Sequence, residues 1–265
     1  MARIRSVLSI LGIVIATVSL GLVAIVAGIL RVRDRPGGVY DWVPRTWSKI
    51  ILRIAGIKVT VHGRANAGTG DPRVFISNHL SLFDVPCLSS VLPRNRFVAK
   101  AELFKIPIFG AAIRAAGMVE IQRDNKRAAF DAYKVAGDKI RSGMSIVVFP
   151  EGTRGTEYAL SQFKKGPFIL AIAAGVPIVP VITHGTREIV RKHEVTVRPG
   201  KVDIHFLEPV PTTGLKYEDR DKLTEMVRDR MVEAMRSLYG VESAPTRIRS
   251  SGSAEPERAL AAAAD

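Results

Sequence analysis

The chain has 265 residues, enough for one sizeable domain with appendages, and 47% of them are hydrophobic, which allows a packed core. The single cysteine, Cys87, excludes an internal disulfide framework and a cysteine-rich metal site. The formal net charge of +14 indicates an anionic partner, either a nucleic acid or an anionic membrane surface.

The first segment decides between those two partners. Residues 6–30 contain no charged side chain and consist mainly of Leu, Ile, Val and Ala. The run is long enough to span about 30 Å of hydrocarbon as a helix, and it is too long for the apolar core of a signal peptide. We therefore expect a membrane partner and no nucleic acid. Arginines flank the run on both sides with the excess after it, so the positive-inside tendency places the rest of the chain on the cytoplasmic side of the cell membrane.

A second helix is predicted over residues 42–57. Its apolar face contains Trp42, Trp47, Ile50, Ile51 and Ile54, and its other face contains Arg45, Lys49 and Arg53. Such a helix fits the headgroup layer of a membrane, with tryptophans at the boundary. It would equally fit a helix packed on the domain, and both interpretations can hold together. A half-embedded hairpin formed with residues 6–30, in place of a full crossing, also stays open.

From residue 57 onward, short β-branched runs alternate with helix-period stretches, which is typical of an α/β sheet. The predicted strands are 58–62, 74–77, 96–100, 118–122, 145–149, 178–183 and 201–207. The predicted helices are 84–91, 107–116, 126–141, 165–174 and 219–239. We divide the chain into a membrane anchor (1–56), a catalytic domain (57–240) and a flexible tail (241–265), because the tail is too polar and alanine-rich to bury enough surface.

The block NHLSLFD at residues 78–84 follows a predicted buried strand. His79 then lies at the end of a sheet strand, where ligand and catalytic groups gather in open α/β sheets. Imidazole is suited to removing a proton from a hydroxyl, and a carboxylate on its other nitrogen would hold the tautomer. Asp84 is the candidate, provided that the chain turns between the two or that Asp84 lies in the first turn of a helix. The alternative is a helix N-terminal acid beside a polar loop histidine.

The block FPEGTR at residues 149–154 follows another predicted strand. Gly152 permits a backbone conformation that lets main-chain groups approach a ligand. Arg154 can bind a phosphate in a bidentate fork. Glu151 cannot bind phosphate directly, so we expect it to orient Arg154 or a backbone turn.

Together the two blocks resemble the NHxxxxD and FPEGTR blocks of the glycerophospholipid acyltransferases, most closely the lysophosphatidic acid acyltransferases. The resemblance covers about residues 57–210 and includes KAELF from residue 100, IQR at 121–123 and VPIVPV at 176–181. It implies a single mixed sheet flanked by helices, a glycerol-3-phosphate acyltransferase-like fold. It also implies an acceptor-phosphate site, formed by Lys100, Arg123, Glu151, Gly152, Thr153 and Arg154. Pro180 corresponds to a proline in a strand that lines the acyl site, although it can also simply punctuate the strand.

The resemblance implies transfer of an acyl group from an acyl thioester to the sn-2 hydroxyl of lysophosphatidic acid, giving phosphatidic acid. His79 is then the base and Asp84 orients it. Acyl-CoA or acyl carrier protein is the co-substrate, and no metal or other cofactor is expected. Another acceptor (glycerol-3-phosphate, a lysophospholipid or a glycolipid) and a non-catalytic, membrane-tethered module that binds anionic lipid or nucleic acid are the alternatives. Cys87 is read as core filling, and no role is assigned to His184.

Overall fold

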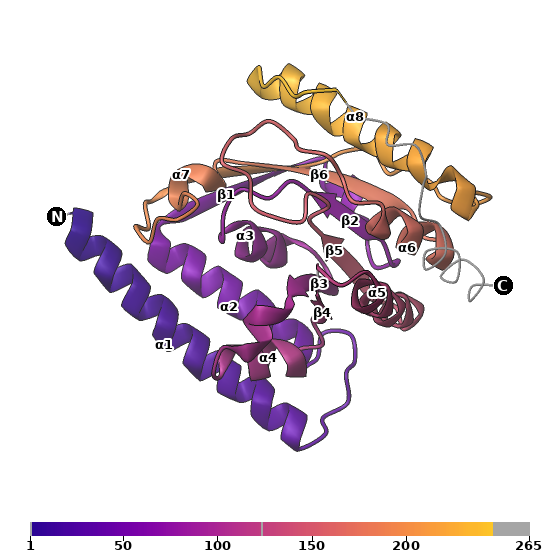
Figure 1. Cartoon of the computed structure of the whole chain (residues 1–265). Coiled ribbons are helices and arrows are strands. Elements are labelled where there is room, and N and C mark those ends of the chain that lie inside the picture. Colours follow the sequence, from indigo (N-terminus) through magenta and orange to yellow (C-terminus); the bar gives the residue numbers. More distant parts are fainter. Residues whose placement is uncertain (1, 123, 246–265) are drawn as a thin grey trace.

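The computed structural model describes residues 2–122 and 124–245, and these contain one seven-stranded sheet (Figure 1). Its strands are β1 (Ile57–His62), β2 (Val74–Ser77), β3 (Asn95–Lys100), β4 (Val119–Ile121), β5 (Ser145–Val148), β6 (Ile178–His184) and β7 (Gly200–Phe206). The order across the sheet is β1-β7-β6-β2-β5-β3-β4. The strands from β6 to β4 are parallel to one another, whereas β7 is antiparallel to β6 and parallel to β1. The predicted single mixed sheet is confirmed.

The helices also follow the sequence prediction closely. They are α1 (Ala2–Ile29), α2 (Val39–Ala55), α3 (Asp84–Val91), α4 (Phe109–Ala115), α5 (Lys126–Arg141), α6 (Gly166–Ala174), α7 (Thr186–Ile189) and α8 (Arg220–Tyr239), with short 3₁₀ turns at Arg64–Ala67, Ala101–Lys105 and Tyr217–Asp219. The sequence analysis missed α7, because a single helical turn has no measurable periodicity.

Helices cover both faces of the sheet, so its central strands are buried on both sides. In β2, Val74 and Ile76 pack into the core beneath α5, α6 and α8, while Phe75 packs into the opposite core with α2 and α3. Figure 1 shows α8 on one side of the sheet and the α1–α2 pair on the other. This double cover explains why β2 and β5 appear in the sequence as uninterrupted apolar runs.

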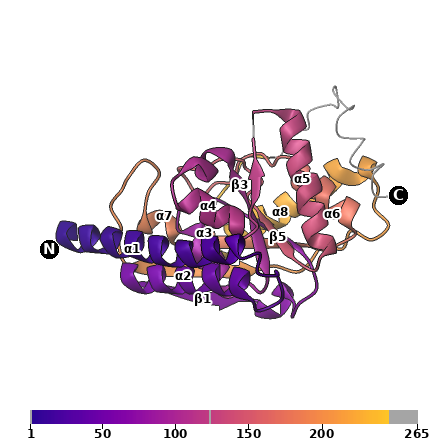
Figure 2. The ribbon, with the colours of Figure 1, turned by 90° about the horizontal axis from the view of Figure 1, so that it is seen from below.

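Helix α1 lies along one side of the domain, beside α2 (Figure 2). Near its start, the Ser6 hydroxyl oxygen accepts a hydrogen bond from Val197 N at 3.0 Å. In its middle, Trp47 Nε1 of α2 donates to Thr17 Oγ1 at 2.9 Å. Near its end, the absence of a side chain at Gly28 leaves room for α4 to approach. The helix is therefore attached to the domain along its whole length.

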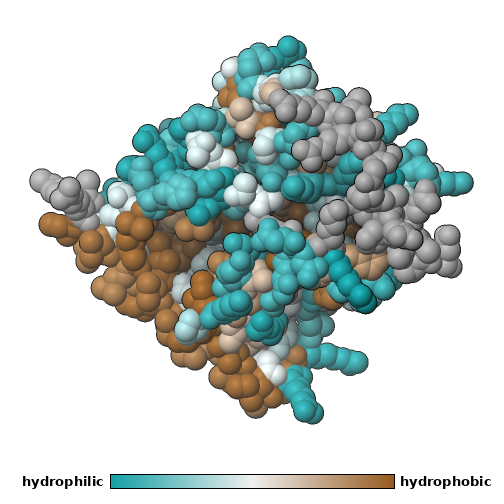
Figure 3. All heavy atoms as spheres, in the orientation of Figure 1, coloured by the Kyte–Doolittle hydropathy of each residue, from teal (hydrophilic) through white to brown (hydrophobic). Residues whose placement is uncertain are grey.

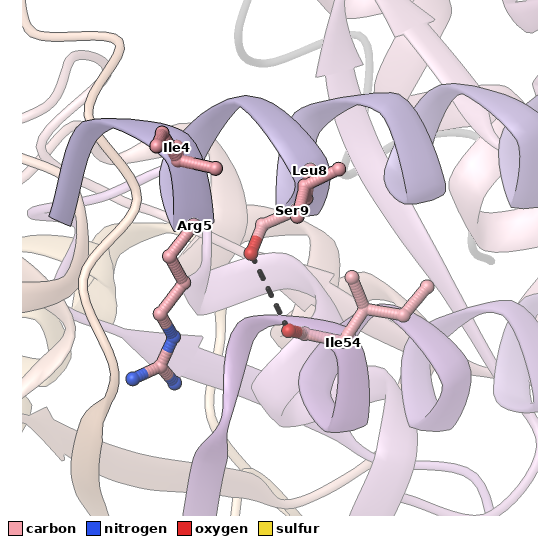
Figure 4. A pocket seen from close by; sticks show the side chains of 5 residues that line it. All are labelled: Ile4, Arg5, Leu8, Ser9 and Ile54. Carbon is pink, nitrogen blue, oxygen red and sulfur yellow. Dashed lines mark hydrogen bonds between the residues drawn. The ribbon is translucent and has the colours of Figure 1, made fainter. Parts of the chain in front are cut away.

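Figure 4 shows the start of this contact, where Ser9 Oγ donates to Ile54 O at 3.4 Å. A shallow hollow of about 380 Å³ lies there, with Ile4, Arg5 and Leu8 also lining it. Arg5 points toward the end of α2, where a cation is favoured by the helix dipole.

The outer side of α1 is apolar and exposed, and it forms much of the hydrophobic band in Figure 3. Its most exposed side chains are Ile4, Val7, Leu8, Ile29 and Leu30. Among the described residues, the segment Ile4–Ile29 is long and apolar enough to cross a membrane.

Residues 246–265 of the predicted tail lie outside the described residues, but its start can be described. Ser243 Oγ accepts a hydrogen bond from Leu160 N at 2.9 Å, and Pro245 O accepts one from Gln162 Nε2 at 3.1 Å. The first residues after α8 therefore lie against the loop that precedes α6. The predicted boundaries at residues 56 and 240 remain predictions.

Candidate active site

Apart from Pro180, the predicted site residues that the structure describes lie at one edge of the sheet, because β2, β5, β3 and β4 are parallel neighbours whose carboxyl ends meet there. His79 follows β2, the 149–154 block follows β5, and Lys100 ends β3. Arg123 comes after β4 but lies outside the described residues.

His79 and Asp84 form a direct pair. His79 Nδ1 lies 2.7 Å from Asp84 Oδ2. The five-residue spacing is possible because residues 79–83 form a turn and Asp84 is the first residue of α3. The carboxylate is buried, whereas the His79 side chain keeps 13% of its surface exposed.

The contacts of Asp84 determine which nitrogen of His79 carries the proton. Asp84 Oδ2 also accepts hydrogen bonds from Leu80 N at 2.7 Å and Ser81 N at 2.8 Å. A carboxylate surrounded by donors accepts from Nδ1, so neutral His79 holds its proton on Nδ1 and leaves Nε2 as a proton acceptor. Within residues 2–122 and 124–245, no group hydrogen-bonds Nε2.

Packing fixes the imidazole ring further. It stacks on the Phe149 ring, with centroids 4.0 Å apart and an interplanar angle of 16°. Gly155 N donates to His79 O at 2.8 Å. Both contacts come from the second block and its continuation, so that segment positions His79.

Two residues near the base had no assigned role in the sequence analysis. Asn78 is buried and its amide forms two hydrogen bonds with the Thr183 backbone, at 2.9 Å to O and 2.8 Å from N. This contact attaches the start of the loop that contains His79 (residues 78–84) to β6. Thr186 Oγ1 donates a short hydrogen bond to Asp84 Oδ1. No motif could have indicated Thr186, because it lies 102 positions after Asp84.

Glu151 connects the two blocks through its carboxylate. Oε1 accepts a hydrogen bond from His79 N at 3.1 Å, and Oε2 accepts from Ser161 N at 3.1 Å and Ser161 Oγ at 2.8 Å. Of the two roles expected for Glu151, these contacts correspond to the orientation of a backbone turn.

The remaining residues of the second block form an open turn. Gly152 has φ +78°, a conformation that favours glycine. Thr153 is exposed, and Arg154 is half-exposed, with its carbonyl accepting a hydrogen bond from Lys192 Nζ at 2.8 Å. In the part of the chain that the structure describes, the Arg154 guanidinium has no hydrogen-bond or ion-pair partner. It is therefore available to an anionic ligand.

Lys100 is exposed and forms an ion pair with Glu102, with Nζ 2.9 Å from Oε1. The hydrogen bond from Lys100 holds the pKa of Glu102 below its usual value. Lys100 would have to exchange this exposed partner for a substrate phosphate, an exchange that is cheap because surface ion pairs contribute little.

Pro180 is buried in β6, opposite Ile76 of β2, and its carbonyl accepts a hydrogen bond from Leu207 N at 2.9 Å. It lies on the same sheet face as Ile178 and Ile182, because side chains alternate along a strand. Its predicted contact with the acyl chain remains a prediction.

Two other titratable residues were singled out in the sequence, and neither is hydrogen-bonded to His79 or Asp84 among the described residues. Cys87 is fully buried, and burial raises the pKa of its thiol, which agrees with core filling. His184 stacks between Tyr158 and Tyr239, at centroid distances of 4.3 and 3.7 Å. Among the described residues, no group of three or more His, Cys, Asp or Glu side chains could hold a metal ion.

Comparison with known proteins gives consistent matches. A family model described as "Acyltransferase" matches residues 58–184. The chain is 30% identical over 212 residues to the 1-acyl-sn-glycerol-3-phosphate acyltransferase of Cocos nucifera, covering 78% of this chain and 67% of the relative. It is 35% identical over 190 residues to 1-acyl-sn-glycerol-3-phosphate acyltransferase alpha of Homo sapiens, covering 71% of this chain and 67% of the relative.

A solved structure agrees with these matches. The 1-acyl-sn-glycerophosphate acyltransferase PlsC from Thermotoga maritima superposes with a TM-score of 0.75 at 30% identity, covering 92% of this chain and 100% of that chain. The likeness thus extends beyond the two blocks to almost the entire fold. The chain is an acyltransferase, and it belongs to the 1-acyl-sn-glycerol-3-phosphate acyltransferase family.

Proposed function

We propose that this acyltransferase moves an acyl group from an acyl thioester to the free sn-2 hydroxyl of lysophosphatidic acid and so makes phosphatidic acid. The observation that carries the proposal is the His79–Asp84 pair at the sheet edge next to the Arg154 turn. Its contact is 2.7 Å long, and no described residue hydrogen-bonds Nε2. The printed names of the relatives support the same acceptor.

The reaction follows from the tautomer of His79. Nε2 removes the proton of the acceptor hydroxyl while the hydroxyl oxygen attacks the thioester carbonyl carbon, and the imidazolium that forms is stabilised by Asp84. The tetrahedral intermediate then collapses, the carbon–sulfur bond breaks, and the leaving thiolate takes the proton back from Nε2. Each turnover returns His79 to its starting state and releases one free thiol.

The acceptor phosphate would lie against the turn at residues 152–154. Arg154 supplies a guanidinium that is free among the described residues, and Gly152 lets the backbone come close. Lys100 and Arg123 would add charge from the ends of β3 and β4. A phosphate monoester carries a charge of about −1.5 to −2 at neutral pH, which suits several cations.

The geometry of α1 favours a helix that lies within one leaflet. The helix is about 42 Å long, and it contacts the domain at both Ser6 and Gly28. A helix that crossed the bilayer would carry one of its ends away from the domain. The exposed apolar stripe would instead enter one leaflet, which we place on the cytoplasmic side of the cell membrane, where arginines 31, 33 and 35 meet anionic headgroups.

The first test measures thiol release from acyl-CoA in membranes supplied with lysophosphatidic acid. His79→Ala should abolish release, because His79 is the group proposed to take the proton. His62→Ala is the matched control, since His62 also pairs with a carboxylate, with Nε2 3.0 Å from Asp203 Oδ1, but lies outside the site. Release that continues unchanged in His79→Ala would remove His79 from the mechanism.

The same assay separates the substrates. Lysophosphatidic acid, glycerol-3-phosphate, other lysophospholipids and a glycolipid are compared against one thioester, and acyl-CoA is compared with acyl carrier protein against one acceptor. We expect lysophosphatidic acid to give the highest kcat/KM. A higher value for another acceptor would reassign the substrate while leaving the proposed base in place.

The membrane topology is tested by labelling with an impermeant maleimide. Arg5→Cys and Arg33→Cys place thiols at exposed polar positions near the two ends of α1, and the native Cys87 is buried. In sealed vesicles of either orientation, both thiols should be labelled from the same side. Labelling from opposite sides would show that α1 crosses the bilayer.

A further inference from the structure

We propose that Thr186 is a positioning residue for catalysis: its hydroxyl holds the Asp84 carboxylate in the orientation that presents Oδ2 to His79. The proposal rests on the roles given to His79 and Asp84 above, and it adds a residue that belongs to neither sequence block. Thr186 is the first residue of α7 and is fully buried.

The two oxygens of Asp84 have different surroundings. Oδ2 accepts hydrogen bonds from His79 Nδ1, Leu80 N and Ser81 N, at 2.7 to 2.8 Å. Among the described residues, Oδ1 has one hydrogen-bond partner, the Thr186 hydroxyl. The threonine therefore donates to the buried Oδ1, whereas the described donors of the 79–84 loop all bind Oδ2.

The position of Thr186 is itself fixed by the fold. Gly185, before it, has φ +98°, and a side chain there would collide with the carbonyl of Lys201. Gly185 N donates to Tyr158 Oη at 2.9 Å. These two restraints determine where β6 ends and α7 begins.

A second contact joins the C-terminal end of α7 to the 79–84 loop. Ser81 Oγ donates to Val190 O at 2.8 Å, while Ser81 N binds Asp84 Oδ2. The segment 186–190 thus contacts the 79–84 loop at both ends. Thr186 meets Asp84 as part of a matched pair of contacts between the two segments.

Removal of the hydroxyl should change the chemistry of the pair. A buried carboxylate oxygen without a donor costs free energy, and the carboxylate can lower that cost by rotating or by taking up a proton more readily. Rotation would weaken the contact with His79. A carboxylate that has taken up a proton would also stabilise the imidazolium less, because its negative charge is lost. Both changes would affect catalysis through His79, and neither alters a group proposed to contact the substrate.

The test compares Thr186→Val, which keeps the shape and loses the hydroxyl, with Thr186→Ser, which keeps the hydroxyl. We expect Thr186→Val to lower kcat by about tenfold, as for the loss of one hydrogen bond to a charged group. Its KM for lysophosphatidic acid and for acyl-CoA should stay within about twofold of the wild type, because Thr186 contacts neither substrate. Because the altered carboxylate stabilises the His79 imidazolium less, the acidic limb of its pH–rate profile should move to lower pH, and Thr186→Ser should restore both kcat and the profile.

The matched control is Thr212→Val. Thr212 is also buried, and its hydroxyl donates to Val176 O at 3.0 Å, far along the chain from the 79–84 loop. Thr212→Val should lower thermal stability without moving the acidic limb. If Thr186→Val behaves like this control, losing stability with an unmoved limb and unchanged kcat per folded enzyme, Thr186 has a structural role only and the proposal fails.

Failure of this proposal is distinguishable from failure of the proposed function. His79→Ala, assayed in parallel, is inactive if His79 is the base, whatever Thr186 does. An active His79→Ala would overturn the base and the role of Thr186 together. An inactive His79→Ala with an unaffected Thr186→Val would overturn the role of Thr186 alone.

Discussion

Asp84→Asn tests the proposed base more finely than the removal of His79, because the structure accommodates the change. If the asparagine oxygen takes the place of Oδ2, it keeps the hydrogen bonds from His79 Nδ1, Leu80 N and Ser81 N. The amide nitrogen then faces Thr186 Oγ1, a hydroxyl that can turn and accept a hydrogen bond. The tautomer of His79 is preserved, and the main loss is one negative charge.

The size of the effect follows from that charge. At about 4 Å between charge centres and an effective dielectric constant of about 20, the attraction between the carboxylate and an imidazolium is about 4 kcal/mol. The proton is only partly transferred in the transition state, so kcat should fall by about 10²- to 10³-fold. The variant should remain folded, and its KM values should change little.

The assay is kcat for thiol release, measured beside thermal unfolding in the same detergent. Asp203→Asn is the control, because it removes the carboxylate from the exposed pair with His62. A loss below about tenfold in Asp84→Asn would mean that the charge of Asp84 contributes little to catalysis. A loss that disappears when activity is expressed per folded molecule would assign Asp84 a structural role and refute the reasoning.

Three other outcomes follow from the structure. Arg154→Lys should raise the KM for lysophosphatidic acid by at least about tenfold while leaving that for acyl-CoA nearly unchanged, because an ammonium cannot make the bidentate contact; equal changes in both would exclude a phosphate clamp. Burial lowers the pKa of His184 and of His205, so the folded state binds fewer protons there than the unfolded state. The stability that these neutral histidines contribute should be fully present above about pH 6.5 and should fall as the pH drops toward their lowered pKa values in the folded state. Urea unfolding between pH 7.5 and 5 measures this, and in His184→Phe, which keeps the ring stack, the fall should be smaller. Lysine at Leu11, Ile15 and Leu22, all exposed on α1, should release the folded protein from membranes; a variant that stays bound would move the anchor to another surface.

The sequence predicted the sheet and the contact between His79 and Asp84 well, because both depend on local patterns. Strand β2 is a buried run, so its limits are visible, and the turn that brings Asp84 to His79 is contained in seven residues. The start of a helix at Asp84 could be predicted because Pro86 suits the first turn of a helix. These features need no knowledge of distant segments.

Contacts between distant segments could not be predicted in the same way. Thr186 reaches Asp84 only because β6 lies beside β2, and strand order across a sheet is not visible in periodicity. Glu151 could be expected to orient either an arginine or a backbone turn, and its contact with His79 N depends on β5 lying beside β2. For Arg123, no comparison of prediction and structure can be made.

Two acidic residues, one before α2 and one in its first turn, connect the N-terminal helices to the sheet. Asp34 and Asp41 weigh little in the charge rule for membrane orientation. In the structure, Arg96 of β3, with 1% of its side chain exposed, pairs with both, at 2.9 Å to Asp34 and 2.8 Å to Asp41. A buried arginine without a partner is costly, so this pairing opposes separation of the α1–α2 turn from the sheet.

The consequence concerns the depth of the site in the membrane. Arg96 lies in the strand that ends at Lys100, and that strand leads through Ala101–Lys105 into α4, which packs on α1. The helix that would lie in the leaflet is therefore attached to the phosphate side of the site at two places. Because the anchor cannot swing independently of β3, the depth of α1 in the leaflet would set the height of the site above the headgroups. A lipid acceptor could then present its hydroxyl to His79 without leaving the bilayer surface.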